Sequence, residues 1–324
     1  MKVFITRIIS ESGIQLLSEA GIEVEMWQEK RNLTPQEFIS HCKKADALLN
    51  AGPNRMDANF LHECSHLKVI ALHAVGYDNV DIETATKLKI PIGNTPGVVD
   101  DATADIAFLL MLAVSRKAFY HHKKIINNQW NFFEPTVDLG QEISGKTLGV
   151  FGLGNIGYKM AKKCIGAYDM KVIYHNRNRN EKAENELHAK YVSFEELLQQ
   201  SDVLTLHANL TPHTRGIFNK VAFEKMKPGS IFINTARGSM HNEPDLIYAL
   251  QQQIIWGAGL DVSSPEPMHH DNPLLQMQNV AVLPHIGTAT FETREAIVKL
   301  AAQNIIAGLR GLPLPHIVNP EIYL

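Results

Sequence analysis

With 324 residues, of which 45% are hydrophobic and 20% are charged, the chain is long enough to form two domains with separate cores. A formal net charge of -3, scattered lysines and arginines, and the lack of any apolar stretch able to span a bilayer argue against nucleic-acid and membrane partners. Because the first residues, MKVFITRIIS, do not resemble a signal peptide, we expect a cytoplasmic protein that acts on small molecules.

Short strand-like runs alternate with helical patterns along nearly the whole chain. A first series of strands is predicted at residues 2–6, 23–26, 47–49 and 69–72. A second series is predicted at residues 148–151, 171–174, 203–206, 230–234, 257–260 and 280–283. Strands separated by helices form parallel sheets with helices on both faces. The alternation therefore predicts an α/β protein with two Rossmann-like domains, each a doubly wound parallel sheet.

Two apolar helical runs mark the domain boundaries. Residues 103–121 are predicted to form one long, buried helix that connects the two series, and residues 290–308 a second crossing helix. We expect one domain made from both chain ends, residues 1–100 and 290–324, with residues 101–289 inserted as another. The cleft at their junction is the expected ligand site.

The sequence Gly-Leu-Gly-Asn-Ile-Gly directly follows the first strand of the second series and opens an amphipathic helix. In that context Gly152 permits a tight turn, Gly154 a close approach of the backbone to a pyrophosphate, and Gly157 close packing of helix on sheet. Asn155 and Ile156 stand at the helix N-terminus, where unpaired N–H groups and the helix dipole favour phosphate. The inserted domain is therefore predicted to bind a dinucleotide.

The end of the next strand bears on which dinucleotide is bound. A carboxylate there would bind the ribose 2'-hydroxyl and repel a 2'-phosphate, but this chain has neutral Asn176, followed by Arg177 and Arg179. Arginine binds phosphate through two parallel hydrogen bonds. The pattern favours NADP over NAD, with NAD still possible; the alternative is that both arginines merely solvate a loop.

Three candidate catalytic residues follow strands of the second series: Arg237, Glu266 and His285. Reduction of a 2-keto acid needs a cation that holds the carboxylate and polarises the ketone, and an acid that protonates the oxygen. Arginine and histidine suit these roles. A carboxylate beside the histidine would fix its tautomer and keep it protonated near neutral pH.

The motifs NTARG, GLDVSSPEP and LPHIGTAT, in that order after GLGNIG, resemble those of the D-isomer-specific 2-hydroxyacid dehydrogenase family. The resemblance covers essentially the whole chain and is strongest to glyoxylate/hydroxypyruvate reductases. It implies that residues 1–100 and 290–324 bind substrate, that Arg237 binds and polarises it, and that His285, paired with Glu266, donates the proton. The expected reaction is reduction of glyoxylate or hydroxypyruvate by NADPH.

The resemblance also implies further contacts. Val75 and Gly76 would offer backbone N–H groups to the substrate carboxylate, although their sequence also fits an ordinary strand-to-helix turn. The remaining positions expected to line the cofactor are Thr103, His207, Asn209, Thr235, Ala236, Asp261 and Gly287, with Arg237 and His285 adjoining them. Asn209 replaces the proline that relatives often carry, so local cofactor contacts can differ.

An aromatic segment that includes Trp130, Phe132 and Phe133 lies where a surface loop is normally polar, which indicates a covering partner. In relatives the corresponding arm packs against a second subunit, so a homodimer is expected, with packing inside one chain as the alternative. Other functions left open are a 2-ketogluconate or other D-2-hydroxyacid dehydrogenase, and a dinucleotide-sensing protein similar to corepressors.

Cysteines and histidines give no sign of a metal site. Cys42, Cys64 and Cys164 are widely spaced in the sequence and form no CxxC pair, so we interpret them as reduced core thiols. The adjacent histidine pairs have no further ligand at a suitable spacing. We expect no metal.

Overall fold

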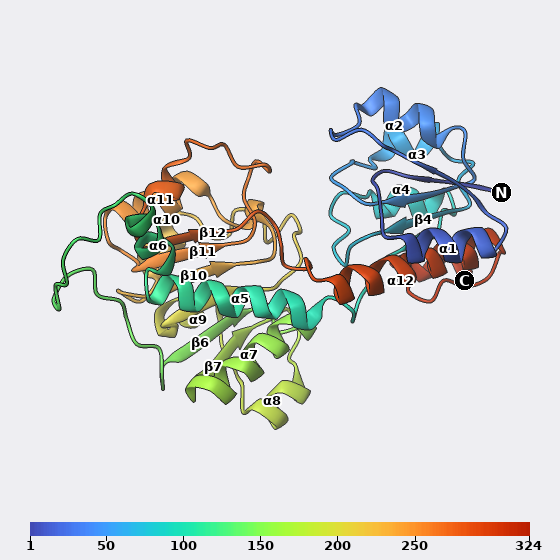
Figure 1. Cartoon of the computed structure of the whole chain (residues 1–324). Helices are drawn as coiled ribbons and strands as arrows, with labels where there is room; N and C mark the ends of the chain where they lie inside the picture. Colours follow the sequence, from blue (N-terminus) through green and yellow to red (C-terminus); the bar gives the residue numbers. More distant parts are fainter. The chain divides into compact units, whose positions relative to one another are not determined.

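The computed structural model describes residues 1–324, which form two compact units (Figure 1). The terminal unit comprises Met1–Val99 and Thr288–Leu324, so the blue and red ends of the chain belong together; the central unit comprises Asp100–Gly287. None of the helices is both long enough and apolar enough to cross a membrane.

The terminal unit is built on a five-stranded sheet of order β2-β1-β3-β4-β5, in which every pairing is parallel. Its elements are β1 (Lys2–Ile5), α1 (Glu11–Glu19), β2 (Glu23–Met26), α2 (Pro35–Cys42), β3 (Ala47–Asn50), α3 (Ala58–Glu63), β4 (Val69–Leu72), α4 (Ile82–Lys87), β5 (Ile92–Gly93) and α12 (Phe291–Leu309), followed by a 3-10 helix (Pro320–Tyr323). The four predicted strands are present, and β5 is an additional one.

Successive residues of each strand supply the two cores of this unit. Val3 and Ile5 pack in the layer that contains Ala301 and Ile305 of α12, whereas Phe4 packs in the opposite layer with helices α2 to α4. Both faces of the sheet are therefore covered, which explains why β3 and β4 are buried along their whole length.

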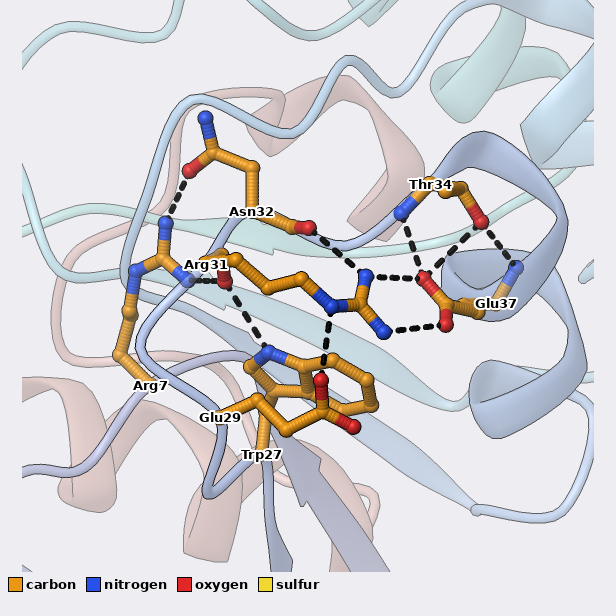
Figure 2. A network of polar contacts seen from close by, with 7 residues as sticks. All are labelled: Arg7, Trp27, Glu29, Arg31, Asn32, Thr34 and Glu37. Carbon is orange, nitrogen blue, oxygen red and sulfur yellow. Dashed lines mark hydrogen bonds and ion pairs between the residues drawn. The ribbon is translucent and has the colours of Figure 1, made fainter.

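A polar network fixes the irregular segment between β2 and α2 (Figure 2). Arg31 donates to both carboxylate oxygens of Glu37, at 2.8 and 2.6 Å, and its guanidinium lies 4.9 Å from the ring centroid of Trp27. Thr34 and Glu37 form a capping box that begins α2. Because these groups are largely exposed, they order the segment more than they stabilise the fold.

The central unit is built on a seven-stranded parallel sheet of order β12-β11-β10-β9-β6-β7-β8. Its elements are α5 (Asp100–Ser115), α6 (Ala118–Ile126), β6 (Thr147–Phe151), α7 (Asn155–Tyr168), β7 (Lys171–His175), α8 (Glu181–Leu187), β8 (Lys190–Tyr191), α9 (Phe194–Gln200), β9 (Val203–Leu206), α10 (Lys220–Lys225), β10 (Ile231–Asn234), α11 (Glu243–Gln251), β11 (Gly257–Leu260) and β12 (Val280–Val282), with 3-10 helices at Gly238–Met240 and Pro273–Gln276. The six predicted strands are present, and β8 is added at the edge.

The chain reverses its direction of travel across this sheet between β6 and β9, which are adjacent. Helices α5 and α7 cover one face, and the core of the other face includes residues of α9, α10 and α11. The sheet is therefore doubly wound, as predicted. In such sheets ligands bind at the carboxyl ends of the strands, near the point of reversal.

The prediction of one buried helix over residues 103–121 was wrong. Helix α5 ends at Ser115, Lys117 adopts a left-handed conformation with φ 51°, and α6 follows with no buried residue. The Ser115 carbonyl accepts a hydrogen bond from the N–H of Gln141 at 2.7 Å, so a returning loop satisfies the helix end. The cysteine prediction is confirmed, because all three cysteines are free and buried.

Candidate functional site

The three glycines of the loop after β6 differ in their conformation and surroundings. Gly152 has φ +97°, and a Cβ there would lie 2.4 Å from the backbone nitrogen of Ala208. A Cβ on Gly157 would lie 2.7 Å from the Gly152 carbonyl oxygen, whereas one on Gly154 would meet nothing within 4 Å. The loop thus lies tight against its neighbours at two glycines and faces open space at the third, as a phosphate-binding loop requires.

Helix α7 begins in this loop without a side-chain cap. Gly154 is the N-cap residue, and the first helical hydrogen bond runs from the N–H of Tyr158 to the Gly154 carbonyl at 2.8 Å. The N–H groups of Asn155, Ile156 and Gly157 have no protein acceptor, which leaves them and the positive end of the helix dipole available to an anion. These residues fit a dinucleotide pyrophosphate.

Asn176, at the end of β7, holds the glycine loop in place. Its Oδ1 accepts from the Leu153 N–H at 2.6 Å, and its Nδ2 donates to the Leu153 carbonyl at 3.2 Å. Asn180 donates to the same carbonyl at 2.8 Å. The position where a carboxylate would bind a ribose 2'-hydroxyl therefore carries a neutral amide whose two polar atoms are already engaged with the backbone.

The two arginines of this segment differ in their surroundings. Arg177 is exposed and pairs with no carboxylate. Arg179 donates through Nε and Nη2 to the two carboxylate oxygens of Glu184, at 3.0 and 2.6 Å. The sequence hypothesis treated them alike, but only Arg177 has its guanidinium unengaged.

The three predicted catalytic residues follow the neighbouring strands β10, β11 and β12. His285 Nδ1 lies 2.9 Å from Glu266 Oε2, and Glu266 Oε1 accepts from the Ser263 N–H at 3.0 Å. Burial acts to raise the pKa of Glu266, but the hydrogen bond and charge of His285, together with the Ser263 N–H and the charge of Arg237, hold that pKa below its usual value. The carboxylate is therefore ionised near neutral pH and fixes the histidine ring by one edge.

The loops that carry Arg237 and Glu266 are packed against each other. A Cβ on Gly238 would lie only 2.0 Å from the Ser263 carbonyl oxygen, so no other residue fits beside Ser263. The positive charge of Arg237 contributes to the lowered pKa of Glu266. The central unit alone thus brings a guanidinium and a carboxylate–imidazole pair to one edge of its sheet.

A buried Asn234–His241 pair shapes the turn that presents Arg237. Asn234 Nδ2 donates to the Arg237 carbonyl at 2.9 Å and to His241 Nδ1 at 3.1 Å, while its Oδ1 accepts from the Ala236 N–H at 3.0 Å. Burial lowers the pKa of His241 to about 4, so its ring is neutral near pH 7 and Nδ1 can accept.

Asp261 secures the backbone next to His285. Its two carboxylate oxygens accept from the N–H groups of Ile286, at 2.8 Å, and Gly287, at 2.7 Å. His285 itself has φ 54°, a backbone angle that residues other than glycine rarely adopt without such restraint. Burial raises the pKa of Asp261 despite these two hydrogen bonds. The sequence placed Asp261 among the residues expected to line the cofactor, and in this structure its carboxylate binds two backbone N–H groups.

The remaining predicted cofactor residues of the central unit are spread around the same edge. His207 Nε2 lies 2.9 Å from Thr205 Oγ1, and Nδ1 lies 3.5 Å from Thr235 Oγ1. Burial lowers the pKa of His207 to about 3, so this ring is neutral. Thr103 is buried in the first turn of α5, and Asn209 is exposed after β9.

Val75 and Gly76 belong to the terminal unit, in the loop that follows β4. The Val75 carbonyl accepts from Asn94 Nδ2 at 2.9 Å, while neither residue's N–H has a protein acceptor. Both N–H groups are therefore chemically available to an anion.

Several positioning residues escaped the sequence analysis. They are Tyr174, Asn180, Glu184, Asn234, His241 and Ser263. Asn234 offered a signal, because a polar residue closes an otherwise apolar strand in INTARG. The others act through tertiary contacts that carry no spacing pattern.

The aromatic segment after α6 is exposed in the single chain. Trp130, Phe132 and Phe133 are 68%, 79% and 77% exposed. Figure 1 shows this stretch, in green, as a long loop between α6 and β6. Three large apolar side chains exposed to water are unusual for a loop.

Comparisons with known proteins find similar sequences along nearly the whole chain. The family model described as "D-isomer specific 2-hydroxyacid dehydrogenase, NAD binding domain" matches residues 108–287. A glyoxylate reductase from Thermococcus litoralis is 42% identical over 99% of this chain and 97% of its own length.

Solved structures share the whole architecture. A glyoxylate reductase from Paecilomyes thermophila is 32% identical, with a TM-score of 0.88 over 99% of both chains. An NADPH-dependent glyoxylate/hydroxypyruvate reductase from Sinorhizobium meliloti, in complex with NADP and malonate, is 26% identical, with a TM-score of 0.84 over 98% of this chain and 96% of that one.

Proposed function

Because the chain belongs to the D-isomer specific 2-hydroxyacid dehydrogenase family, we propose that it reduces glyoxylate or hydroxypyruvate to the 2-hydroxy acid and prefers NADPH to NADH. The observation that carries this proposal is the hydrogen bond of 2.9 Å between His285 and Glu266, at the same sheet edge as Arg237. This set contains the cation and the oriented acid that keto-acid reduction needs.

The residues divide the work as follows. A reduced nicotinamide dinucleotide, with its pyrophosphate held by the glycine loop, would supply a hydride to the substrate C2. Arg237 holds the substrate carboxylate and polarises the ketone, and His285 Nε2 gives its proton to the ketone oxygen, which becomes the hydroxyl. Glu266 keeps Nδ1–H pointing at itself, so that Nε2 faces the substrate, and stabilises the charged ring before transfer.

The two units have different proposed roles. The central unit binds the dinucleotide through the glycine loop and the unpaired N–H groups at the start of α7. The terminal unit contributes the N–H groups of Val75 and Gly76, which bind the substrate carboxylate. Substrate specificity would then depend on both units and cofactor specificity on the central one.

Preference for NADPH is supported by the residues after β7. Asn176 is uncharged, so nothing at that position repels a 2'-phosphate. Arg177 is exposed and unpaired, so its guanidinium can bind the phosphate without first breaking an ion pair. The Sinorhizobium meliloti relative is described as NADPH-dependent.

Initial-rate kinetics tests the proposal directly. The purified protein is assayed with glyoxylate, hydroxypyruvate, pyruvate and 2-ketogluconate, each with NADPH and with NADH. The expected result is rapid turnover of glyoxylate or hydroxypyruvate, faster with NADPH. Activity on 2-ketogluconate alone would overturn the substrate assignment, and no turnover of any substrate would favour a dinucleotide-sensing role.

The exposed aromatic segment leads us to propose a homodimer. Trp130, Phe132 and Phe133 together present an apolar surface that a second copy of the chain would cover. Light scattering should give twice the mass of one chain, and replacing all three residues by serine should give a monomer. A monomeric unmodified protein would contradict the proposal.

A further inference from the structure

A polar network joins β7 to α8 beside the proposed 2'-phosphate region. Tyr174 is fully buried on β7; its hydroxyl donates to Glu184 and accepts from the Asn180 N–H at 2.8 Å. Glu184 also accepts two hydrogen bonds from Arg179, at 3.0 and 2.6 Å. One carboxylate therefore links a core tyrosine to a surface arginine.

The carboxylate is the fixed member of the ion pair. The Glu184 side chain is 19% exposed, whereas that of Arg179 is 66% exposed. The hydrogen bonds from Arg179 and Tyr174 hold the pKa of Glu184 below its usual value, so it stays ionised near neutral pH. A ligand that takes Arg179 must therefore draw it away from an anchored anion.

A phosphate and a carboxylate bind the same edge of a guanidinium through two parallel hydrogen bonds. Arg179 offers Glu184 its Nε and Nη2, the pair of donors that such binding uses. Arg179 thus cannot give the same two donors to a 2'-phosphate while the ion pair is intact. Arg177, which has no such partner, is not restricted in this way.

We propose that Glu184 limits the preference for NADPH: it competes with the ribose 2'-phosphate for Arg179, and so reduces the affinity for NADPH without affecting the affinity for NADH. This inference deepens the proposed function, since it concerns the same dinucleotide site. It assigns the two arginines different roles: Arg177 binds the 2'-phosphate directly, and Glu184 withholds Arg179 from it.

Isothermal titration calorimetry with 2',5'-ADP and 5'-AMP tests the competition without any catalytic step. Glu184→Gln removes the charge but keeps an amide oxygen that can accept from Tyr174, so the network should remain folded. We expect the variant to bind 2',5'-ADP about three- to fivefold more tightly, the size of a partly exposed ion pair, with 5'-AMP unchanged. NADPH and NADH should follow the same pattern.

Two further variants separate release of Arg179 from a general change in charge. Glu181→Gln removes a carboxylate from the same helix, at a residue that makes no ion pair, and should leave both affinities unchanged. Arg179→Ala should have little effect alone, and should abolish the gain when combined with Glu184→Gln.

The outcomes distinguish this inference from the broader proposal. An equal gain in Glu181→Gln, an equal gain for 5'-AMP, or no gain in Glu184→Gln would overturn the role of Glu184. If the unmodified protein binds 2',5'-ADP no better than 5'-AMP, the NADPH preference fails. A selective gain in Glu184→Gln would still support competition for Arg179.

Discussion

Lowering the pH from 8 to 5 should destabilise the central unit through His241. Its pKa is lowered to about 4 by burial, against about 6.5 in an unfolded chain. Between these values the unfolded chain binds a proton that the folded chain does not. The free energy of unfolding is therefore unaffected by the titration of this residue above about pH 6.5, and it decreases as the pH falls toward about 4. Integrating the linkage relation from pH 8 to 5 gives a loss of about 2 kcal/mol in the free energy of unfolding.

Urea unfolding of the unmodified protein and of His241→Gln, each at pH 8 and pH 5, measures this term. The variant has no titrating group at this position, so its pH-dependent loss should be smaller by about 2 kcal/mol. The C2 proton of His241 should also titrate near pH 4 in the NMR spectrum. Equal losses in both proteins, or a midpoint near 6.5, would refute the reasoning. Because protonated Nδ1 cannot accept from Asn234, the turn that presents Arg237 should loosen in the folded protein as the pH falls through about 4.

Four other substitutions have distinct expected outcomes. His285→Ala should retain NADPH binding, followed by fluorescence, yet lose about 100- to 10,000-fold in kcat; near-normal turnover would exclude it as the proton donor. Glu266→Gln should lower kcat less, while its KM for glyoxylate changes little, because it leaves the donor present but poorly oriented. Asp261→Asn loses an acceptor for one backbone N–H, so kcat should fall about tenfold with an unchanged NADPH Kd, and a change in Kd alone would instead assign Asp261 to the cofactor. Asn176→Asp should weaken NADPH relative to NADH in competitive binding, and an unchanged ratio would show that this position does not sense the 2'-phosphate.

The elements that the sequence predicted well are those governed by local pattern. Apart from β2, the predicted strands are largely apolar runs bounded by turns, and burial on both faces makes such runs easy to recognise. The glycine loop follows β6 and the candidate catalytic residues follow β10, β11 and β12, at the ends of strands that the sequence had predicted.

Features that depend on tertiary contact were not predictable. Strands β5 and β8 have two residues each, too short for an alternating pattern. At the break after Ser115, the chain returns at Gln141, whose N–H donates to the Ser115 carbonyl. The ion pair of Arg179 with Glu184 and the hydrogen bonds from Ile286 and Gly287 to Asp261 likewise join residues whose separation in the sequence follows no recognisable motif. For these polar groups, the partner that the fold supplies, rather than the residue type, decides what the group does.

The edge strand β5 is completed by residues from the far end of the chain. Asn319 Oδ1 accepts from the Ile92 N–H at 2.9 Å, and the Val318 N–H donates to the Ile92 carbonyl at 2.8 Å. Helix α12 supplies Ala301, Ala302 and Ile305 to one of the two cores of the same sheet. During synthesis the contiguous central unit can therefore fold on the ribosome while the first 99 residues still lack the core layer from α12 and the segment that pairs with β5. The terminal unit can complete this core layer and this edge only after α12 and the segment that follows it have been translated, so one apolar face of its sheet stays uncovered while the central unit is synthesised.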